Sequence, residues 1–389
     1  MIRSIILSLS LSLSLVGLAP ALAAPLPPPP KVAAKAWILI DADTGRVLTE
    51  QAADDRLPPA SLTKLMTSYV LSSELATGRV SNEDMVEVSE NAWAQNPVFA
   101  GSSLMWIEPG RPVSLMQLHR GVVVSSGNDA TVAIAEHVAG SEDAFADMMN
   151  AYAVELGMTG THYVNSHGLP HPEHYTTARD LARLADGLIT RFPEEYSLYQ
   201  EREFTYNGIR QFNRNTLLAE DATVDGLKTG HTEEAGYCLV ASALREDMRL
   251  VSVVLGADSQ RSRKTESRKL LNWGFRSYET LSLYKPGDVL ATPRLWMGEL
   301  QNLSLGVAEE VLLTIPRGSR DALEAVMEID QRIKAPIAQG DSFGELVIRL
   351  GDETLVQAPL IAQQSIPQSG LLNRLWDMIK LFFMQLFGN

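Results

Sequence analysis

Residues 57–67 read LPPASLTKLMT, and this stretch places Ser61 and Lys64 three positions apart at the predicted start of a helix. Pro58 and Pro59 fit a helix start, where a missing backbone N–H costs little. Positions i and i+3 share a helix face, so the Lys64 amine can reach the Ser61 hydroxyl. A serine becomes a good nucleophile when a base removes its proton, and a lysine can be that base when its pKa falls. The alternative is an ordinary surface pair of serine and lysine.

Two further motifs favour the nucleophile. In GLKTGHT, Lys228 and Gly230 lie on one face of a predicted strand, where Lys228 supplies a second cation and Gly230 leaves room for a ligand backbone. Ser126-Gly127-Asn128 offers a hydroxyl for proton relay and an amide that can hold a peptide group. The motifs S-x-x-K, S-G-N and K-T-G follow in this order, about 65 and about 100 residues apart. Together they predict a serine acyl-transfer enzyme.

Length and composition set the frame for this prediction. The chain has 389 residues, of which 45% are hydrophobic, so it is long enough for two globular domains. Its formal net charge of −14 argues against a nucleic-acid partner, which would favour a basic surface.

The first residues have the pattern of a secretory signal peptide. Arg3 precedes an apolar stretch over residues 5–18, and Ala21-Leu22-Ala23 offers a cleavage site, so residues 1–23 are predicted to be removed before Ala24. The alternative of a membrane-spanning anchor is disfavoured because the apolar stretch is short. An exported chain with the single cysteine Cys238 forms no internal disulfide, and we expect Cys238 to fill a buried strand.

The order of predicted elements indicates the fold class. A hairpin is predicted in AWILIDADTGRVLTE (36–50), helices dominate over 61–188, strands return from 224, and a helix follows in SRKLLNWGFRSYE (267–279). This order predicts an α/β (α+β) serine-hydrolase-like domain over residues 24–283, in which helices cover one antiparallel sheet. Short alternating strands over 284–366 predict a small all-β domain.

Four segments resemble a known family: PPASLTKLMTSYV, SSGNDATVAIAEHVAGSEDAF, NGIRQFNRN and VDGLKTGHTEEAGYCLVASA. From about residue 34 to the C-terminus the chain resembles the low-molecular-mass penicillin-binding proteins that act as D-alanyl-D-alanine carboxypeptidases. The resemblance implies a penicillin-recognising serine hydrolase fold, a β-rich second domain and a C-terminal amphipathic anchor. It also implies removal of the terminal D-alanine from peptidoglycan pentapeptide stems, acylation by β-lactams, and no cofactor or metal.

The resemblance also assigns roles to the motif residues. Ser61 is implied to be the acylated nucleophile and Lys64 its base. Ser126 would relay the proton to the leaving amine, and Asn128 would hold the peptide amide. Lys228 would lower the pKa values around it and help to position Ser126.

The remaining implied residues bind the substrate. Thr229 and Arg214 would bind its terminal carboxylate, for which a guanidinium is suited, although Arg214 could equally be an ordinary surface arginine. The backbone N–H groups of Ser61 and His231 would form the oxyanion hole beside Gly230. The middle motif reads S-G-N rather than S-D-N, which suits this carboxypeptidase family.

Other features allow competing interpretations. The segment SHGLPHPEHY suggests a metal site, but its prolines and glycine break any helix, so a loop bordering the active site is preferred. The possible metal ligands are His167, His171, Glu173 and His174. A class A β-lactamase would need a deacylating carboxylate in an E-x-x-L-N loop, a context that Glu173 lacks. A non-enzymatic peptidoglycan-binding or scaffolding protein is disfavoured by the intact serines and lysine.

The C-terminal residues 367–389 predict an amphipathic helix. Its apolar positions follow the i, i+3, i+4, i+7 rule and are Leu372, Leu375, Trp376, Ile379, Phe382, Phe383 and Leu386. The polar positions on the other side are Asn373, Arg374, Asp377, Lys380 and Gln385, with Leu381 and Met384 among them. A buried core helix is one alternative, and the charged residues argue against a bilayer span. We expect an interfacial helix that attaches the enzyme peripherally to the periplasmic face of the cytoplasmic membrane.

Overall fold

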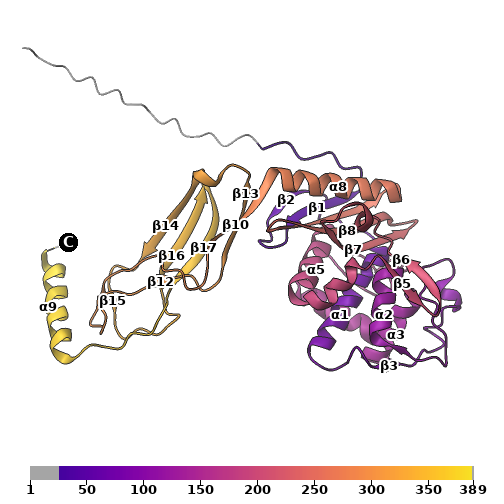
Figure 1. Cartoon of the computed structure of the whole chain (residues 1–389), viewed down its shortest axis with the longest axis horizontal. Helices are drawn as coiled ribbons and strands as arrows, with labels where there is room; N and C mark the ends of the chain where they lie inside the picture. The colour runs from indigo at the N-terminus through magenta and orange to yellow at the C-terminus, as the bar shows by residue number, and fades with distance from the viewer. Residues whose placement is uncertain (1–25, 388–389) are drawn as a thin grey trace, which may run out of the picture.

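The computed structural model of the protein describes residues 26–387, so the predicted signal peptide at 1–23 lies outside the described residues. The described chain forms an N-terminal body of helices around a sheet, a β-rich body beside it and a separate helix at the far end (Figure 1). The C-terminal helix is therefore remote from the larger body, with the β-rich body between them.

A five-stranded antiparallel sheet forms the centre of the N-terminal body. In spatial order its strands are β2 (Val47–Gln51), β1 (Ala36–Asp41), β9 (Met248–Ala257), β8 (Gly236–Arg245) and β7 (Val224–Thr232). Strand β1 pairs with β2 and also with β9, so the first and last parts of the body meet in one sheet. The hairpin predicted for residues 36–50 and the antiparallel strands predicted from residue 224 are both confirmed.

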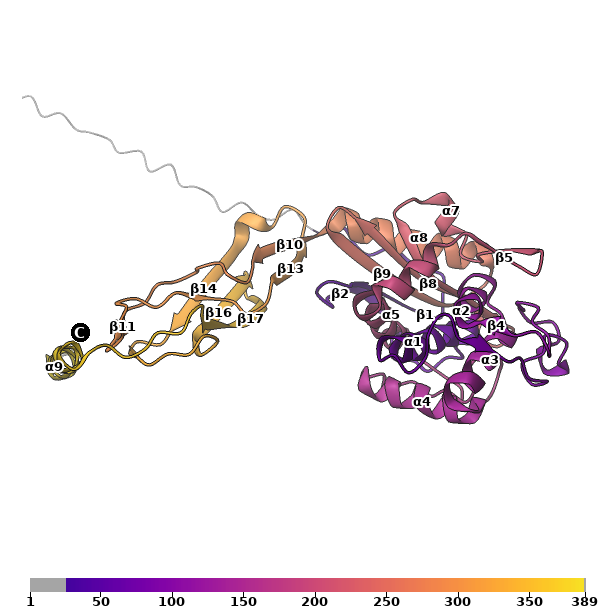
Figure 2. The same ribbon diagram turned by 60° about the horizontal axis from the view of Figure 1, so that its bottom comes forward.

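Helices cover both faces of this sheet. Strand β1 is buried along its whole length, and successive side chains point to opposite faces. Ile38 and Ile40 pack with the helices between β2 and β7, whereas Trp37 and Leu39 pack with α8 (Gln260–Ser277). Figure 2 shows the sheet between α8 and the pair α1 and α5. The uninterrupted apolar run in β1 is thus explained by burial on both sides.

The segment between β2 and β7 contains seven α-helices among the described residues. They are α1 (Thr63–Ala76), α2 (Leu115–Arg120), α3 (Asn128–Ala139), α4 (Glu142–Glu155), α5 (Ala178–Arg191), α6 (Pro193–Tyr196) and α7 (Leu217–Glu220). Two small antiparallel two-stranded sheets, β3 (Met85–Val86) with β4 (Val113–Ser114) and β5 (Glu203–Tyr206) with β6 (Ile209–Phe212), lie among them. Residues 77–112 are mostly loop, so the helical part is less continuous than the sequence indicated.

Helix α8 is longer than predicted. It begins at Gln260 rather than near residue 267, because the Ser259 side chain accepts a hydrogen bond from the Ser262 N–H and caps a polar first turn. It ends at Ser277, where strand β10 (Tyr278–Tyr284) begins at once. The apolar residues lie in the C-terminal half of the helix, where they pack on the sheet, so the apolar pattern predicted only that half.

The β-rich body starts with β10. This strand pairs with β13 (Val311–Pro316), so β10 belongs with the second body. The domain boundary expected at residue 284 falls at the end of β10, whereas the second body begins at the start of this strand. The other strands are β11 (Leu295–Trp296), β12 (Leu305–Gly306), β14 (Leu323–Ile329), β15 (Ile333–Lys334), β16 (Ser342–Leu350) and β17 (Glu353–Ala362). Four of them form a sheet in the order β12-β17-β16-β14 over a separate hydrophobic core.

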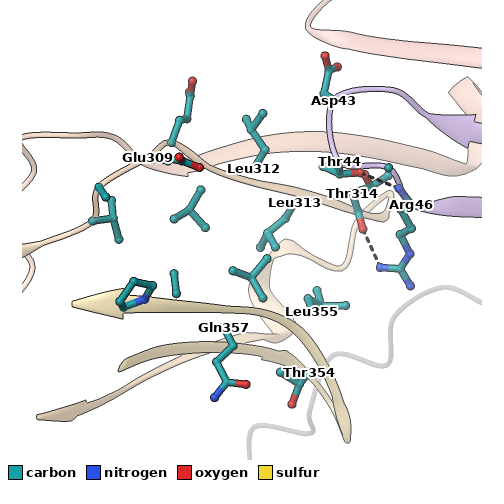
Figure 3. Close-up of a pocket in the computed structure, with 18 of the residues that line it drawn as sticks. Asp43, Thr44, Arg46, Glu309, Leu312, Leu313, Thr314, Thr354, Leu355 and Gln357 are labelled. Carbon is teal, nitrogen blue, oxygen red and sulfur yellow. Dashed lines mark hydrogen bonds between the residues drawn. The ribbon is translucent and has the colours of Figure 1, made fainter. Parts of the chain in front are cut away.

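Polar contacts join the two bodies. The buried carboxylate of Asp41, at the end of β1, accepts hydrogen bonds from the hydroxyls of Thr280 and Thr314, the latter at 2.7 Å. Arg46 lies beside Thr314 (Figure 3) and donates to its carbonyl at 2.8 Å. Arg46 also pairs with Glu353 of β17. Asp41 therefore connects the central sheet directly to β10 and β13.

A cavity of about 770 Å³ opens at this junction. Its lining comes from the hairpin turn 43–46 and from residues 307–314 and 353–359, and Figure 3 shows Leu312, Leu313 and Leu355 around it. None of the S-x-x-K, S-G-N and K-T-G residues belongs to this lining, so we place the chemistry in a smaller cleft described below.

The last helix, α9 (Leu371–Phe387), is amphipathic as predicted. The buried Asp377 carboxylate accepts a hydrogen bond from the Met297 N–H at 2.8 Å, so this side of the helix contacts the β-rich body. Ten large apolar side chains of the helix are exposed: Leu371, Leu372, Leu375, Trp376, Met378, Ile379, Phe382, Phe383, Met384 and Leu386. Among residues 26–387 no helix combines the length and the hydropathy needed to cross a bilayer.

Replacing Thr314 by Val should destabilise the chain, because the substitution keeps the shape but removes a hydrogen bond to the buried Asp41 carboxylate. Such a bond to a charged group is worth about 1.5–3 kcal/mol. Thr354 is exposed and lines the same cavity. Thr354→Val is therefore the matched control and should change the free energy of unfolding by less than about 0.5 kcal/mol. Thermal unfolding measures both variants, and equal midpoints for the two would contradict the role given to Asp41.

Candidate active site

Ser61 lies in a tight turn that leads into α1. Residues Ala60–Leu62 form a 3-10 turn, and the α-helix begins at Thr63, so Ser61 precedes the helix that the sequence predicted it to open. Ala60 has a φ of 48°, a conformation that an alanine rarely adopts. The turn presents Ser61 to a cleft, while Lys64 in the first turn of α1 is buried behind it.

The Lys64 amine contacts three oxygen atoms. Its Nζ lies 3.1 Å from Ser61 Oγ, 2.6 Å from Asn128 Oδ1 and 2.7 Å from the His167 carbonyl oxygen. A neutral amine has two N–H bonds and one lone pair. The two N–H groups can donate to Asn128 Oδ1 and the His167 carbonyl oxygen, which make the shorter contacts. The lone pair then points to the Ser61 hydroxyl and can accept its proton. The geometry therefore suits Lys64 as a base.

Burial makes the neutral amine accessible near neutral pH. Removal from solvent is the largest effect and lowers the pKa of Lys64 to about 7; Asp129 opposes the shift, and the positive charge of Arg214 adds to it. Burial, and then the positive charge of Lys64, also hold the pKa of Lys228 well below its usual range. The charged form of Lys64 thus disfavours the charged form of Lys228.

Ser126 and Lys228 form a second pair in the same site. Ser126 follows a π-helical turn, Gly121–Ser125, and has a φ of 62°. The Lys228 Nζ donates to Ser126 Oγ at 2.9 Å and to the Thr229 carbonyl at 3.1 Å. A serine in this left-handed conformation is uncommon, and such residues gather at functional sites. The pair can move a proton between the cleft and Lys228.

A cleft of about 250 Å³ unites the three motifs. The predicted site residues in its lining are Ser61, Ser126, Asn128, Arg214, Thr229, Gly230 and His231. Lys64 and Lys228 lie behind this lining and reach it through the two serine hydroxyls. The structure therefore brings all nine predicted site residues together.

Strand β7 forms one wall of the cleft. It is the last strand of the sheet, so one of its edges has no sheet neighbour within residues 26–387 and can pair with an extended peptide. A Cβ added at Gly230 would lie 3.0 Å from the Pro59 carbonyl oxygen and 3.3 Å from the Ala60 Cβ. A side chain here would therefore press on the Ser61 turn, which favours glycine for a reason beyond the ligand approach that the sequence suggested.

Sequence analysis missed Arg263. This buried residue of α8 donates to the Gly230 carbonyl at 2.9 Å, lies over the Tyr237 ring and lines the cleft. Tyr237 also stacks on His231, with ring centroids 4.0 Å apart. Arg263 falls in the polar first turns of α8, where no pattern in the sequence distinguishes it from a surface arginine.

Asp129, next to Asn128, was also missed. Its buried carboxylate accepts hydrogen bonds from the backbone N–H groups of Met105, Trp106 and Ile107. The loop that this carboxylate holds includes residues 101–103, which line the cleft. Its place directly after the S-G-N motif was the one available signal.

The histidine-containing segment borders the cleft, as predicted. His167 offers its backbone carbonyl to Lys64, and His167 and Leu169 line the cleft. Burial lowers the pKa of His167 to about 3 and that of His174 to about 4, so both rings are neutral near pH 7. His171 is exposed, and its Nδ1 accepts a hydrogen bond from the Glu173 N–H. His174 Nδ1 accepts a hydrogen bond from the Val164 N–H, so each of the three histidines makes a hydrogen bond in or beside this loop.

Comparison with known proteins gives consistent matches over most of the chain. Residues 23–259 match the family D-alanyl-D-alanine carboxypeptidase, and residues 278–368 match the C-terminal domain of penicillin-binding protein 5. D-alanyl-D-alanine carboxypeptidase DacC of Escherichia coli is 46% identical over 92% of this chain and 90% of its own length.

Solved structures agree with these matches. Penicillin-binding protein 5 of Haemophilus influenzae superimposes with a TM-score of 0.82 at 41% identity, covering 88% of this chain and 99% of that one. The ampicillin-bound form of penicillin-binding protein D2 of Listeria monocytogenes gives a TM-score of 0.57 at 30% identity, covering 64% of this chain and all of that one (100%).

The pKa of Lys64 predicts how acylation of Ser61 depends on pH. Below about pH 7 the amine is protonated and has no lone pair for the serine proton, so the rate should fall roughly tenfold from pH 8 to pH 6. Stopped-flow labelling with a penicillin measures this rate. Lys264→Gln, which removes a surface lysine of α8, should leave the profile unchanged. A rate that stays flat from pH 6 to pH 8 would exclude Lys64 as the base.

Proposed function

This chain belongs to the D-alanyl-D-alanine carboxypeptidases of the penicillin-binding protein family, and from that premise we propose that Ser61 forms the acyl-enzyme in its reaction. The observation that carries this proposal is the contact of Ser61 Oγ with the buried Lys64 amine, at 3.1 Å. The substrate we infer is the pentapeptide stem of peptidoglycan, which ends in two D-alanine residues.

Acylation begins when Lys64 takes the proton of the Ser61 hydroxyl. The oxygen then attacks the carbonyl carbon of the penultimate D-alanine, while the stem peptide lies along the free edge of β7. The backbone N–H groups of Ser61 and His231 stabilise the negative oxygen of the tetrahedral intermediate. Asn128, already bonded to Lys64 at 2.6 Å, is close enough to hold the peptide amide of the substrate.

Collapse of this intermediate breaks the peptide bond. The nitrogen of the terminal D-alanine takes a proton from the Ser126 hydroxyl and leaves as an amine. Lys228, whose Nζ lies 2.9 Å from Ser126 Oγ, gives a proton to Ser126 in its place. Once the D-alanine has left, proton exchange with solvent returns Lys64 to its neutral form and Lys228 to its protonated form. A water molecule then attacks the ester on Ser61. Lys64 takes the proton of this water and passes it to Ser61 Oγ as the ester bond breaks, and the stem leaves one residue shorter.

Positive charge at one end of the cleft suits the substrate carboxylate. Arg214 and Thr229 line this end, and the charge of Arg214 also lowers the pKa values of Lys64 and Lys228. Arg214 is exposed, so it can reach a ligand without leaving a buried partner. We assign Arg214 and Thr229 to the terminal carboxylate, for which a guanidinium and a hydroxyl are good donors.

The lining of the cleft disfavours a β-lactamase. Among the described residues that line it there is no aspartate or glutamate. The segment 162–176 places the His167 carbonyl beside Lys64, and a carbonyl oxygen cannot act as a base. We therefore propose that a penicillin acylates Ser61 and is released slowly.

Ser61→Ala should abolish both labelling by a penicillin and release of D-alanine, because the attacking oxygen is gone. Ser126→Ala is the informative comparison: it should slow turnover while the adduct still forms on Ser61. Intact-mass analysis and peptide mapping after incubation with a penicillin locate the adduct. Finding it on Ser126 in the unchanged chain would contradict the assignment.

We further propose that α9 attaches the mature enzyme to the outer face of the cytoplasmic membrane without crossing it. Fully burying an apolar side chain is worth about 1.5–3 kcal/mol, so seven on one face give a gross gain on the order of 10 kcal/mol. Spanning would instead take Asp377 and Lys380 through hydrocarbon, at about 2.5–3.5 kcal/mol each. The signal-peptide pattern at residues 1–23 supports export to that side.

Truncation after Pro367 should release an enzyme that still cleaves a short D-alanyl-D-alanine peptide, because the helix lies far from the cleft. Trp376→Glu combined with Phe383→Glu should release it as well, whereas Asn373→Glu, on the polar side, is the matched control and should not. Fractionation into membrane and supernatant, with activity assayed in both, measures the effect. A truncated chain that remains in the membrane fraction would show that α9 is not the anchor.

A further inference from the structure

A buried histidine outside the catalytic set contacts the turn that carries Ser61. The His174 Nε2 lies 2.7 Å from the Thr63 hydroxyl, and the Val164 N–H donates to His174 Nδ1 at 3.0 Å. Both side chains are buried, His174 at 3% exposure and Thr63 at 0%. His174 has no part in the reaction described above. It nevertheless contacts Thr63, the first residue of the helix that follows the nucleophile.

The hydrogen-bond partners determine where each proton lies. Because Nδ1 accepts from Val164, the proton of the neutral ring is on Nε2, which donates to the Thr63 oxygen. The Thr63 hydroxyl then has its own proton free, and it donates to the Ala60 carbonyl at 2.9 Å. Burial is the main effect that lowers the pKa of His174, to about 4, and it keeps the ring neutral. The bonds therefore run in one direction, from the loop to Ala60.

The turn at Ala60 depends on outside support. Its φ of 48° is unfavourable for alanine, so contacts around it must hold it there. A Cβ added at Gly168 would lie 1.9 Å from the Ala60 carbonyl oxygen, which shows how closely the loop packs on the turn. The same loop gives the His167 carbonyl to Lys64. Segment 162–176 thus contacts the nucleophile turn at Ala60, Thr63 and Lys64.

We propose that His174 is a positioning residue: through the Thr63 hydroxyl it holds the Ala60 carbonyl, and with it the Ser61 turn, in the geometry that acylation requires. This inference rests on the proposed function, since it takes Ser61 as the nucleophile. His174 touches no reacting atom. Its loss should therefore slow bond formation at Ser61 and leave binding of the peptide nearly unchanged.

Two amide variants separate the two ring nitrogens. In His174→Gln the longer side chain brings an N–H close to the position of Nε2, so it can still donate to Thr63. In His174→Asn the shorter amide reaches only the position of Nδ1, so it can still accept from Val164 but loses the donor to Thr63. Loss of one buried hydrogen bond commonly changes an equilibrium or rate by about tenfold.

The rate constant for acylation of Ser61 by a penicillin should fall about tenfold in His174→Asn and stay within about threefold of the unchanged enzyme in His174→Gln. The KM for a D-alanyl-D-alanine peptide should change less than about twofold in both, provided that binding precedes a slow chemical step. His171→Asn, on the exposed part of the same loop, is the matched control and should have no effect on either constant.

A double-mutant cycle tests the route through Thr63. In a Thr63→Val background His174→Asn should add less than about a twofold loss, because the hydroxyl that it serves is already absent. Equal acylation rates for the Asn and Gln variants, or an undiminished tenfold loss in the Val background, would overturn the proposal and leave only a structural role. Absence of any adduct on Ser61 in the unchanged chain would instead contradict the proposed function, and this inference with it.

Discussion

The Lys64 amine is removed from solvent and meets three oxygen atoms that come from three separate parts of the chain. These are the Ser61 hydroxyl, the Asn128 amide oxygen and the His167 carbonyl. A buried ammonium group loses several kcal/mol of hydration, whereas a neutral amine loses much less. Burial therefore holds the amine in the form that can accept a proton, and any route for bulk water to Lys64 would remove that advantage.

This requirement explains why α1 is buried on all sides. Eleven of its fourteen residues are buried, including Lys64, Thr67 and Ser68, so the helix has no solvent face over most of its length. Two of its buried hydroxyls have partners inside the protein: Thr67 donates to the Ser166 carbonyl, and Ser68 contacts His119. The sheet on one side and the helices α3, α4 and α5 on the others supply the cover that a buried lysine needs.

The same arrangement shows what a sequence can and cannot reveal. The strands β1, β2, β7, β8 and β9 were predictable because their apolar runs and turns are local. That the nine predicted site residues lie together was predictable from three short motifs and, for Arg214, from the family resemblance. Arg263 and His174 were not, because their roles come from contacts with residues 33 and 111 positions away in the chain. The start of α8 and the place of β10 in the second body were missed for a similar reason, since capping by Ser259 and pairing with β13 leave no apolar signature.

Two residues in unfavourable backbone conformations flank the chemistry, Ala60 before the nucleophile and Ser126 in the relay. The left-handed region costs an ordinary residue about 1–2 kcal/mol, so neither turn would persist without support. Buried hydrogen bonds lie beside both turns. Thr63 donates to the Ala60 carbonyl, and Asp129, three residues after Ser126, accepts from the Met105 N–H in the loop against which Gly127 packs. These bonds support the two turns. Strain of this kind fixes the two hydroxyls relative to the two lysines before a substrate arrives, and it is tolerable because the large two-sided core of the catalytic body stabilises the whole.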